Sequence, residues 1–546
     1  MAQAPSRSAL LRTLRESANR FDAESSQRKR EALQRLMALP LAADAALADY
    51  HDTLLFIAAH PPDEAVRGMV ERELRRLAVW LKARRGRHLA AWADRGMPWV
   101  DTVTRFTHDC VRWLLGHPHC KVVPDRYDEP LLDLNAVLKL TLPTLERNET
   151  TASLDNDALL DALKVKPARR LAFIVGELAR LDAQPFVKDQ LFDALDLYVR
   201  VQPTSAAFSK AGNRLPVARV FFQPDLLRRF DPMALMNQPL PPPRRLGADA
   251  RAELVRVLRN TMALTSRETD PATYLDARAL RVYALERGLA VALFGMTPER
   301  QLPLESYVGF TLFKNGLPVA YGGAWVMGER AAFGMNIFEP FRGGESGFMM
   351  CQVLRAYRQA FKVRYFEVDA HQFGLDNPDG IASGAFWFYY RHGFRPLSAP
   401  LQRLALQEKK RIDARPGYHS PDKTLLRFTE SNVALNFGGA VPPHLFDVTT
   451  RVTRMIASAY GGDRAAAERD GVARLGQLVR LPRRLNDDER RVLTEVALIA
   501  QALPVRDAAG LDLLVRMVRA KPKDLWAYQG LLLAFFSQPR VRHGAV

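Results

Sequence analysis

The sequence predicts an α/β (α+β) protein in which a mixed central sheet is flanked by all-helical N- and C-terminal regions. Apolar residues recur at helical spacing through the first 238 residues and again after residue 430. Between these regions, apolar strand-like runs flank the dipeptide Asn315-Gly316, the strongest short indicator of a β-hairpin. A glycine-rich turn at residues 342–347 then separates a strand-like run from a helical run.

The length of the chain predicts several domains. A chain of 546 residues is too long for one hydrophobic core, and chains of this size divide into about three domains. A proline run, 239–247, is extended and cannot lie inside a helix, so it is the clearest linker. We therefore expect a helical domain at 1–238, a mixed α/β domain at 248–430 and a helical region at 431–546.

The N-terminal region is expected to be entirely helical. Pro61-Pro62-Asp63-Glu64 has the composition of a helix start, and apolar residues from Val66 to Leu81 then fall on one face. Further amphipathic runs include Arg170–Leu181 and Val187–Val199. We interpret all of these runs as helices.

A group of histidines and cysteines in this region has the residue types of a zinc site. Its spacing matches no standard zinc finger, and Cys110 lies in an apolar run. We therefore expect core packing and no metal. The group consists of His108, Cys110, His117, His119 and Cys120.

The central region begins with two expected helices, the second passing through Leu280 and Tyr283. A meander of strands follows and leads into the glycine-rich turn. Two later strand-like pieces, Leu401–Leu406 and Thr424–Phe428, are expected to complete the sheet. The C-terminal region is expected to be helical, and it carries no recognisable chemistry.

The charge of the chain favours acidic partners. The formal net charge is +18, which suits nucleic acid, an acidic carrier protein or a nucleotide cofactor. The arginines are spread over several helices, so a general compositional bias explains the charge equally well. No apolar run approaches the ~20 residues that span a bilayer, and the N-terminus has no apolar core of a secretory signal. With three cysteines, these features predict a cytoplasmic protein.

The glycine-rich turn carries the clearest indication of function. A turn of this kind that opens a helix presents free backbone N–H groups, and the helix dipole adds positive potential. Together they form an anion site. Downstream lie the strand-like run Tyr365–Asp369 and the aromatic helix Phe386–Tyr390, followed by Gly393-Phe394.

These motifs resemble those of the GNAT superfamily of acyl-CoA-dependent N-acyltransferases. Arg342 and Gly347 fill the first and last positions of the family's pyrophosphate-binding turn, and Tyr389 precedes Gly393-Phe394 at the family's spacing. The resemblance covers roughly 180 residues, from near Gly247 to near Phe428. Glu345 departs from the pattern, because the family places glycine there and a carboxylate repels a pyrophosphate.

The resemblance implies that acetyl-CoA or another acyl-CoA is the donor. It also implies that Tyr389 protonates the leaving thiolate, with the neighbouring Tyr390 as an alternative. Asn377 is the counterpart of the family's loop asparagine, at a longer spacing than usual. The implied donor-binding residues are Arg342, Gly343, Gly344, Ser346, Gly347 and Asn377.

The base that activates the amine is expected near the strand after the turn. Glu367, Asp369 and His371 alternate with apolar residues and would share one strand face, which either lines a functional cleft or meets solvent and arginines. Glu339 is a weaker candidate. The acceptor amine is expected near His371 and the loop after the first central helix, at Arg267, Glu268 and Asp270.

Three functions follow from this interpretation. The first is an N-acyltransferase that moves an acyl group from acyl-CoA to an amine by direct attack. The second is a transferase that takes its group from aminoacyl-tRNA, as the related Fem-type peptidoglycan enzymes do, or from an acyl carrier protein. The third is a GNAT-like domain without catalysis that serves as a binding or scaffold protein.

Overall fold

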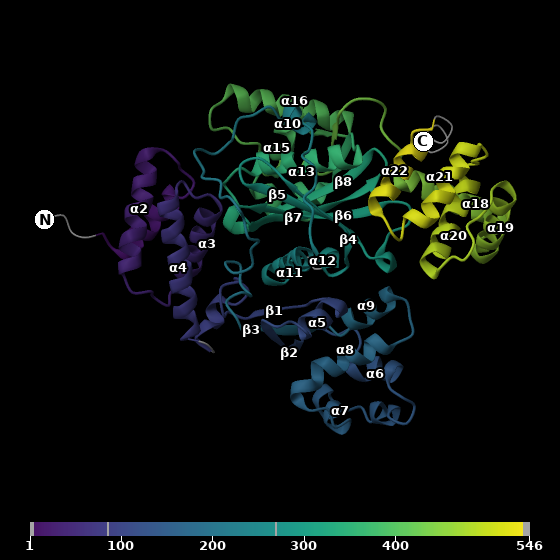
Figure 1. The fold of residues 1–546 in the computed structure, drawn as a ribbon, viewed down its shortest axis with the longest axis horizontal. Helices are drawn as coiled ribbons and strands as arrows, with labels where there is room; N and C mark the ends of the chain where they lie inside the picture. Colours follow the sequence, from purple (N-terminus) through teal and green to yellow (C-terminus); the bar gives the residue numbers. More distant parts are fainter. Residues whose placement is uncertain (1–4, 85–86, 268–269, 539–546) are drawn as a thin grey trace.

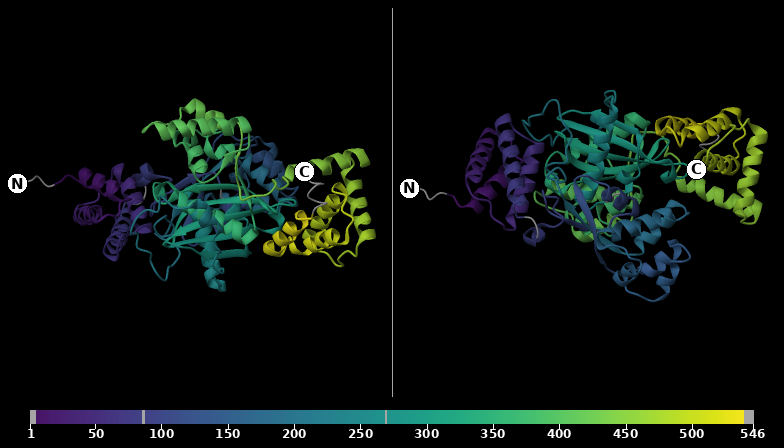
Figure 2. Two further views of the ribbon diagram at one scale, coloured as in Figure 1. Left: turned by 90° about the horizontal axis from the view of Figure 1, so that it is seen from above. Right: turned by 60° about the horizontal axis from the view of Figure 1, so that its bottom comes forward.

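The computed structural model describes residues 5–84, 87–267 and 270–538. A large mixed sheet occupies the centre of the molecule. The N-terminal helices and the C-terminal helices lie at opposite ends of this sheet, and a smaller α/β part lies beneath it (Figures 1 and 2). The chain is therefore a mixed α/β protein with helical flanks.

The N-terminal part is a bundle of four helices, two of which begin at capping aspartates. The Asp22 carboxylate accepts a hydrogen bond from the Ser25 amide at 2.8 Å, and Asp63 accepts one from the Val66 amide at 2.8 Å. The predicted helix start at Asp63 is confirmed. The helices are α1 (Arg7–Ser17), α2 (Ala23–Ala38), α3 (Ala46–Ala59) and α4 (Glu64–Lys82).

The prediction that the first 238 residues are entirely helical is wrong. Three strands form a small antiparallel sheet in the order β1-β3-β2: β1 (Thr102–Thr104), β2 (Cys120–Tyr127) and β3 (Leu197–Pro203). In β3, apolar and polar residues alternate and every second residue is buried, so the period is that of a strand. The helices around it are α5 (His108–Leu115), α6 (Leu134–Thr141), α7 (Asn156–Ala162), α8 (Arg170–Arg180) and α9 (Pro185–Asp193).

The central sheet has eight strands in the order β10-β11-β9-β8-β7-β6-β5-β4. All neighbours are antiparallel except β8 and β9, which are parallel. The crossover between these two strands contains α13 (Ser346–Phe361). The strands are β4 (Leu275–Ala284), β5 (Leu289–Met296), β6 (Ser306–Lys314), β7 (Leu317–Met327), β8 (Arg330–Ile337), β9 (Tyr365–Val368), β10 (Arg395–Pro396) and β11 (Val433–Asn436).

Helices cover both faces of this sheet. Val291 and Leu293 of β5 belong to the same apolar cluster as the buried face of α13, whereas Ala292 and Phe294 belong to the cluster of α11 (Ala248–Thr265). Figure 1 shows the two helices on opposite sides of the sheet. Two buried faces explain why β5 and β7 are apolar at nearly every position.

The hairpin predicted at Asn315-Gly316 is confirmed. These two residues join β6 to β7 with φ of +47° and +83°, the left-handed conformations that a two-residue turn requires. The Asn315 side-chain amide also donates to the backbone carbonyls of Ala59 and Phe221, each at 2.9 Å. The turn therefore fixes the end of α3 against the sheet.

Two predictions for the central region are wrong. The segment through Leu280 and Tyr283 is strand β4 and not a second helix, because its β-branched and aromatic residues pair with β5. The segments expected as final strands are helices α16 (Ala399–Ala414) and α17 (Asp422–Phe428). Leu401 and Ala405 of α16 are buried at a spacing of four, which is helical. The short strands β10 and β11 complete the sheet instead.

The C-terminal part is helical, as predicted. It contains α18 (Leu445–Tyr460), α19 (Arg464–Leu478), α20 (Asp487–Ala502), α21 (Ala508–Ala520) and α22 (Leu525–Phe536). The connecting helices of the chain are α10 (Pro232–Asn237), α12 (Asp270–Thr273), α14 (Pro378–Ala382) and α15 (Ala385–Arg391). Within the described residues, no helix combines the length and the apolar character needed to cross a bilayer.

Candidate functional site

The glycine-rich turn lies at the N-terminus of α13, directly after β8. A short 3-10 helix, Glu339–Phe341, leads into it, and Gly343 takes a φ of +83° that favours glycine. Arg342 and Gly343 are exposed, while Gly344, Ser346 and Gly347 are shielded to differing degrees by the surrounding fold. The Arg342 Nε donates to the Ile337 carbonyl at 3.3 Å. The predicted turn, followed by a helix of sixteen residues, is confirmed.

Strands β8 and β9 separate beside this turn. Their parallel pairing covers three positions, Arg330↔Tyr365 to Ala332↔Glu367, and β8 then continues to Ile337 paired with β7 alone among the described strands. The side chain of Gln372 lies over Gly334 on one face of the sheet, where a Cβ added to that glycine would lie 3.5 Å from Gln372 Nε2. The separation leaves strand edge next to a helix N-terminus, a place where an extended ligand can bind.

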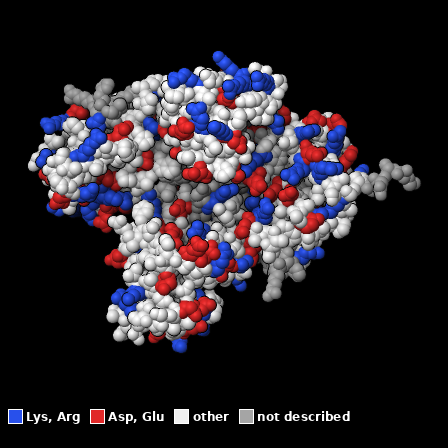
Figure 3. Space-filling model, turned by 180° about the vertical axis from the view of Figure 1, so that it is seen from behind, with Lys and Arg blue, Asp and Glu red and all other residues white. Residues whose placement is uncertain are grey.

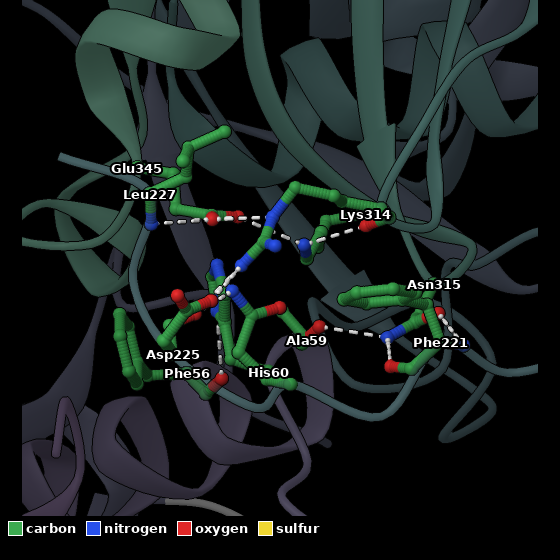
Figure 4. Close-up of polar contacts among 11 residues, drawn as sticks. Phe56, Ala59, His60, Phe221, Asp225, Leu227, Lys314, Asn315 and Glu345 are labelled. Carbon is green, nitrogen blue, oxygen red and sulfur yellow. Dashed lines mark hydrogen bonds and ion pairs between the residues drawn. The ribbon is translucent and has the colours of Figure 1, made fainter. Parts of the chain in front are cut away.

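The carboxylate of Glu345 points into the protein. It is 1% exposed and accepts hydrogen bonds from Arg287 Nε at 2.7 Å, Lys314 Nζ at 3.0 Å and the Leu227 amide at 2.9 Å (Figure 4). Lys314 is itself fully buried, and its Nζ also donates to the Arg287 carbonyl at 2.6 Å. Two cations therefore compensate the charge that was expected to repel a phosphate at the turn.

This cluster changes the acidity of both of its buried members. Burial opposes the ionised form of Glu345, but Lys314, the Leu227 amide and Arg287 together hold the pKa of its carboxyl below the ordinary value. Burial lowers the pKa of Lys314 to about 8, although Glu345 opposes that change. At neutral pH both groups are charged, so the cluster is an ion pair.

Two histidines pack against the turn, and both were missed in the sequence. His60, at the C-terminal end of α3, lies with Phe56 against Gly344, where an added Cβ would stand 3.3 Å from His60 Nε2. His392, at the end of α15, lies against Gly347, where a Cβ would stand 2.3 Å from its Nε2. No local motif marks either residue, because each reaches the turn only through the tertiary fold.

Both histidines are held in the same tautomer. Nδ1 of His60 lies 3.2 Å from the Phe56 carbonyl, and Nδ1 of His392 lies 2.6 Å from the Phe388 carbonyl. A carbonyl only accepts, so the proton is on Nδ1 and Nε2 is an acceptor. Burial lowers the pKa of His60 to about 3 and lowers that of His392. Neither ring carries the charge that would attract a phosphate.

Tyr389 is a residue of α15, and its ring forms part of the aromatic core. Its side chain is 4% exposed, and its ring packs against Phe373, Phe388 and Phe394. Burial raises its pKa, which keeps the phenol protonated. The neighbouring Tyr390 is also buried, and Arg395 lies over its ring at 4.0 Å. Because His392 of the same helix segment touches Gly347, the fold brings the aromatic helix and the turn together.

The expectation that three acidic and basic residues share one face of β9 is wrong. The strand ends at Val368, so only Glu367 lies on it. Its buried carboxylate pairs with Arg330 and accepts a hydrogen bond from Asn432 Nδ2 at 2.7 Å. Asp369 is exposed and caps the short helix Ala370–Phe373 by accepting from the His371 amide at 2.9 Å. Capping therefore ends the strand.

The remaining residues of the predicted site are dispersed. His371 is exposed, and its Nδ1 lies 2.8 Å from the Leu375 carbonyl, while Glu339 lies at the entry to the turn. Asn377 caps α14: its side-chain oxygen accepts from the Gly380 amide at 3.3 Å, and its side-chain nitrogen donates to the His371 carbonyl at 2.8 Å. These bonds engage both ends of the Asn377 amide.

The predicted acceptor loop lines a separate cavity. Arg267 and Asp270 border a pocket of about 420 Å³ together with Arg105, Asp193 and Asp196. No residue of the glycine-rich turn or of α15 lines this pocket. Glu268 lies outside the described residues. The fold thus brings Arg267 and Asp270 together without joining them to the turn in one cavity.

The cysteine and histidine group forms part of the core of the smaller α/β part. Cys110 and Cys120 are buried, and His108 Nε2 lies 2.9 Å from the Val175 carbonyl. Among the described residues, no three His, Cys, Asp or Glu side chains form a group that could hold a metal ion. On the face seen in Figure 3, acidic and basic side chains are interspersed, without a single basic block.

Comparison of the chain with family models, curated proteins and solved structures finds no match. The function proposed below therefore rests on the geometry of the site.

Proposed function

We propose that the chain is an acyl-CoA-dependent N-acyltransferase with a GNAT-like central domain. The order of elements supports the proposal: β8, the glycine-rich turn, α13, β9 and the aromatic helix α15 follow one another and meet around the turn. Acetyl-CoA or another acyl-CoA would be the donor, and the acceptor would be an amine.

One observation carries the proposal. Arg342 and Gly343 are exposed at the N-terminus of α13 beside the open edge of β8, and the carboxylate of Glu345 is turned into the ion cluster below. A donor phosphate would meet backbone N–H groups and a guanidinium without an uncompensated acid. A phosphate therefore suits this turn better than the sequence alone indicates, because Arg287 and Lys314 compensate the charge of Glu345.

The reaction forms a C–N bond and breaks a C–S bond. As the amine nitrogen attacks the thioester carbonyl, the nitrogen loses a proton and the departing thiolate takes one. Tyr389 is suited to donate that proton, because burial keeps it neutral and its hydroxyl makes no hydrogen bond to a described residue. Asp369 and His371 are the exposed groups after β9 that are available to accept the proton of the amine.

Thermal unfolding with acetyl-CoA or free CoA tests the donor site. We expect a saturable rise in Tm, because a ligand at 100 times its Kd stabilises the folded state by about 2.7 kcal/mol. Arg342→Ala should raise the ligand concentration that gives half of the rise at least roughly tenfold, the contribution of a charge-assisted hydrogen bond. Arg403→Ala removes an exposed arginine on α16 that forms no ion pair with a described residue, and it should leave that concentration unchanged. No shift at millimolar ligand and low salt would contradict acyl-CoA as the donor, and tRNA and acidic carrier proteins would then be tested in its place.

A second candidate, a GNAT-like domain that binds without catalysis, is favoured by the packing around the turn. Tyr389 is nearly enclosed, and His60 and Phe56 cover Gly344. Release of CoA thiol in the presence of amines separates the two proposals. A transferase should release thiol and lose at least roughly tenfold in kcat in Tyr389→Phe. A binding protein should show the Tm shift, no turnover with any thioester, and no effect of Tyr389→Phe beyond stability.

A further inference from the structure

A basic hollow lies where the proline-rich linker crosses β4 and meets the C-terminal helices. Its volume is about 670 Å³, and its walls come from the linker, the first turn of α11, β4 and the loop before α22. The positively charged residues that line it are Arg244, Arg245, Arg251, Arg278, Arg281 and Lys523. No residue of the glycine-rich turn lines it, so it is a second and separate feature.

Most of this positive charge is not compensated within the protein. Arg278 pairs with Asp276 at 2.8 Å, and Lys523 pairs with Glu489 at 2.7 Å. The other four arginines of the hollow form no ion pair with any carboxylate of the described residues. They are Arg244, Arg245, Arg251 and Arg281.

The one acid among the described residues of the wall is already engaged. Asp524 caps α22, where its Oδ1 accepts hydrogen bonds from the Trp526 and Ala527 amides at 3.0 and 3.1 Å. Asp524 remains an anion, so the four unpaired arginines and this one carboxylate leave a net charge of +3 in one concavity (four minus one). This excess raises the local positive potential. An anion that enters the hollow offsets this excess.

Two of the guanidinium groups and the backbone of a third arginine are held in place by the fold. The guanidinium of Arg281 lies 3.8 Å from the centre of the Trp526 ring, and Phe361 stacks on the same ring with its centre 4.6 Å away. Arg251 Nη1 donates to the Ala277 carbonyl at 2.5 Å. The Arg244 backbone amide donates to the Val282 carbonyl at 2.7 Å, which fixes the linker along β4. A site held in this way loses little freedom when it binds.

We propose that this hollow binds a small anion with two or more phosphate groups. Guanidinium groups bind phosphate oxygens in pairs, and four of them match a polyphosphate better than a single carboxylate. The volume lies within the roughly 300–1,000 Å³ of small-molecule sites. Trp526 is covered by Arg281 and Phe361, so it is not free to stack on a base as in single-stranded nucleic acid sites. The charge therefore selects phosphate groups, not bases.

Calorimetric titration with inorganic tripolyphosphate tests the proposal. The Arg342→Ala chain is used as the background, so that binding at the glycine-rich turn is weakened. We expect one saturable site whose affinity falls as salt rises. Arg244→Gln/Arg245→Gln should weaken it at least roughly tenfold, because each charge-assisted hydrogen bond contributes about that factor or more.

Two further variants keep the test decisive. Arg403→Gln/Arg415→Gln removes the same charge from exposed positions on and after α16 and should leave the affinity within about twofold. Arg244→Lys/Arg245→Lys keeps the charge and should retain most of the binding. The proposal is overturned if both Gln pairs behave alike, if millimolar tripolyphosphate gives no saturable heat, or if a single-stranded oligonucleotide binds the hollow more tightly than tripolyphosphate. These results do not depend on acyl-CoA binding, so the two proposals fail separately.

Discussion

Removal of the Glu345 carboxylate should strongly destabilise the central domain. In Glu345→Leu, the fully buried Lys314 loses its counterion, and its remaining partner is the Arg287 carbonyl at 2.6 Å. Because Glu345 opposes the effect of burial on the pKa of Lys314, its removal lowers that pKa further, and folding then costs either an unpaired buried charge or the loss of the proton. Breaking a buried ion pair by removing one partner costs about 3–5 kcal/mol. For a unit of about this domain's size, 1 kcal/mol corresponds to roughly 2–4 °C. The expected fall in Tm is therefore roughly 6–20 °C.

The partner variant should cost less, and this asymmetry comes from the geometry. In Lys314→Met, Glu345 still accepts from Arg287 at 2.7 Å and from the Leu227 amide at 2.9 Å, so its charge remains compensated. We expect a loss of about 1.5–3 kcal/mol, the contribution of one hydrogen bond to a charged group. The double variant removes both buried charges, and apolar replacement of such pairs is often close to neutral. It should therefore be more stable than Glu345→Leu alone.

Differential scanning calorimetry of the four chains gives this double-mutant cycle. Glu430→Leu is the matched control, because Glu430 is exposed and forms no ion pair in the described structure. The effect should also depend on pH. The lowered pKa of Glu345 means that its stabilisation is complete above the ordinary value of 4.5 and is lost as the pH falls through its value in the folded state. Additive single losses, or a cost below about 1 kcal/mol for Glu345→Leu, would refute the ion-pair argument.

Three further outcomes test other parts of the fold. Lys29 is fully buried, and burial lowers its pKa to about 8 from 10.5, so the unfolded state binds more protons and stability should rise with pH between about 8 and 10.5. Lys29→Met should remove that rise and gain about 2–3 kcal/mol at pH 7, measured by denaturant unfolding at several pH values; an unchanged pH profile would contradict it. Gly347→Ala should cost about 1–3 kcal/mol in thermal unfolding, because its Cβ would stand 2.3 Å from His392 Nε2, and a neutral result would mean that the ring moves freely. Tyr389→Phe should leave the CoA-dependent Tm shift intact, and loss of that shift would place the hydroxyl in donor binding.

The parts of the fold that the sequence predicts are those determined by local chemistry. Asn315-Gly316 defines a hairpin because few residue pairs adopt two left-handed conformations, and Asp63 defines a helix start because its side chain caps the first turn. The errors arise in short segments. The alternating residues of β3 begin inside the predicted helical run Val187–Val199, and a seven-residue helix such as α17 has too few turns to distinguish it from a strand.

The candidate site contains information that no local sequence pattern supplies. Glu345 takes its partners from residues 31, 58 and 118 positions away, at Lys314, Arg287 and Leu227. From the sequence alone, the carboxylate of Glu345 is expected to repel an anion bound at the turn. In the fold, this carboxylate points into the protein. His60 reaches the turn from the N-terminal bundle and is equally invisible in the sequence around residue 344.

The glycines of the turn show why the motif alone does not decide between ligand binding and packing. Gly344 lies against His60 and Phe56, so packing is sufficient reason for glycine at that position. Gly347 is explained in the same way by the ring of His392. Gly343 takes a φ of +83°, which is itself sufficient reason for glycine, but its backbone is exposed, and a Cβ added there would have its nearest contact 3.9 Å away at Asn19. The case for a bound anion therefore depends on the exposed backbone at Gly343 and on the exposed side chain of Arg342, and not on the number of glycines in the turn.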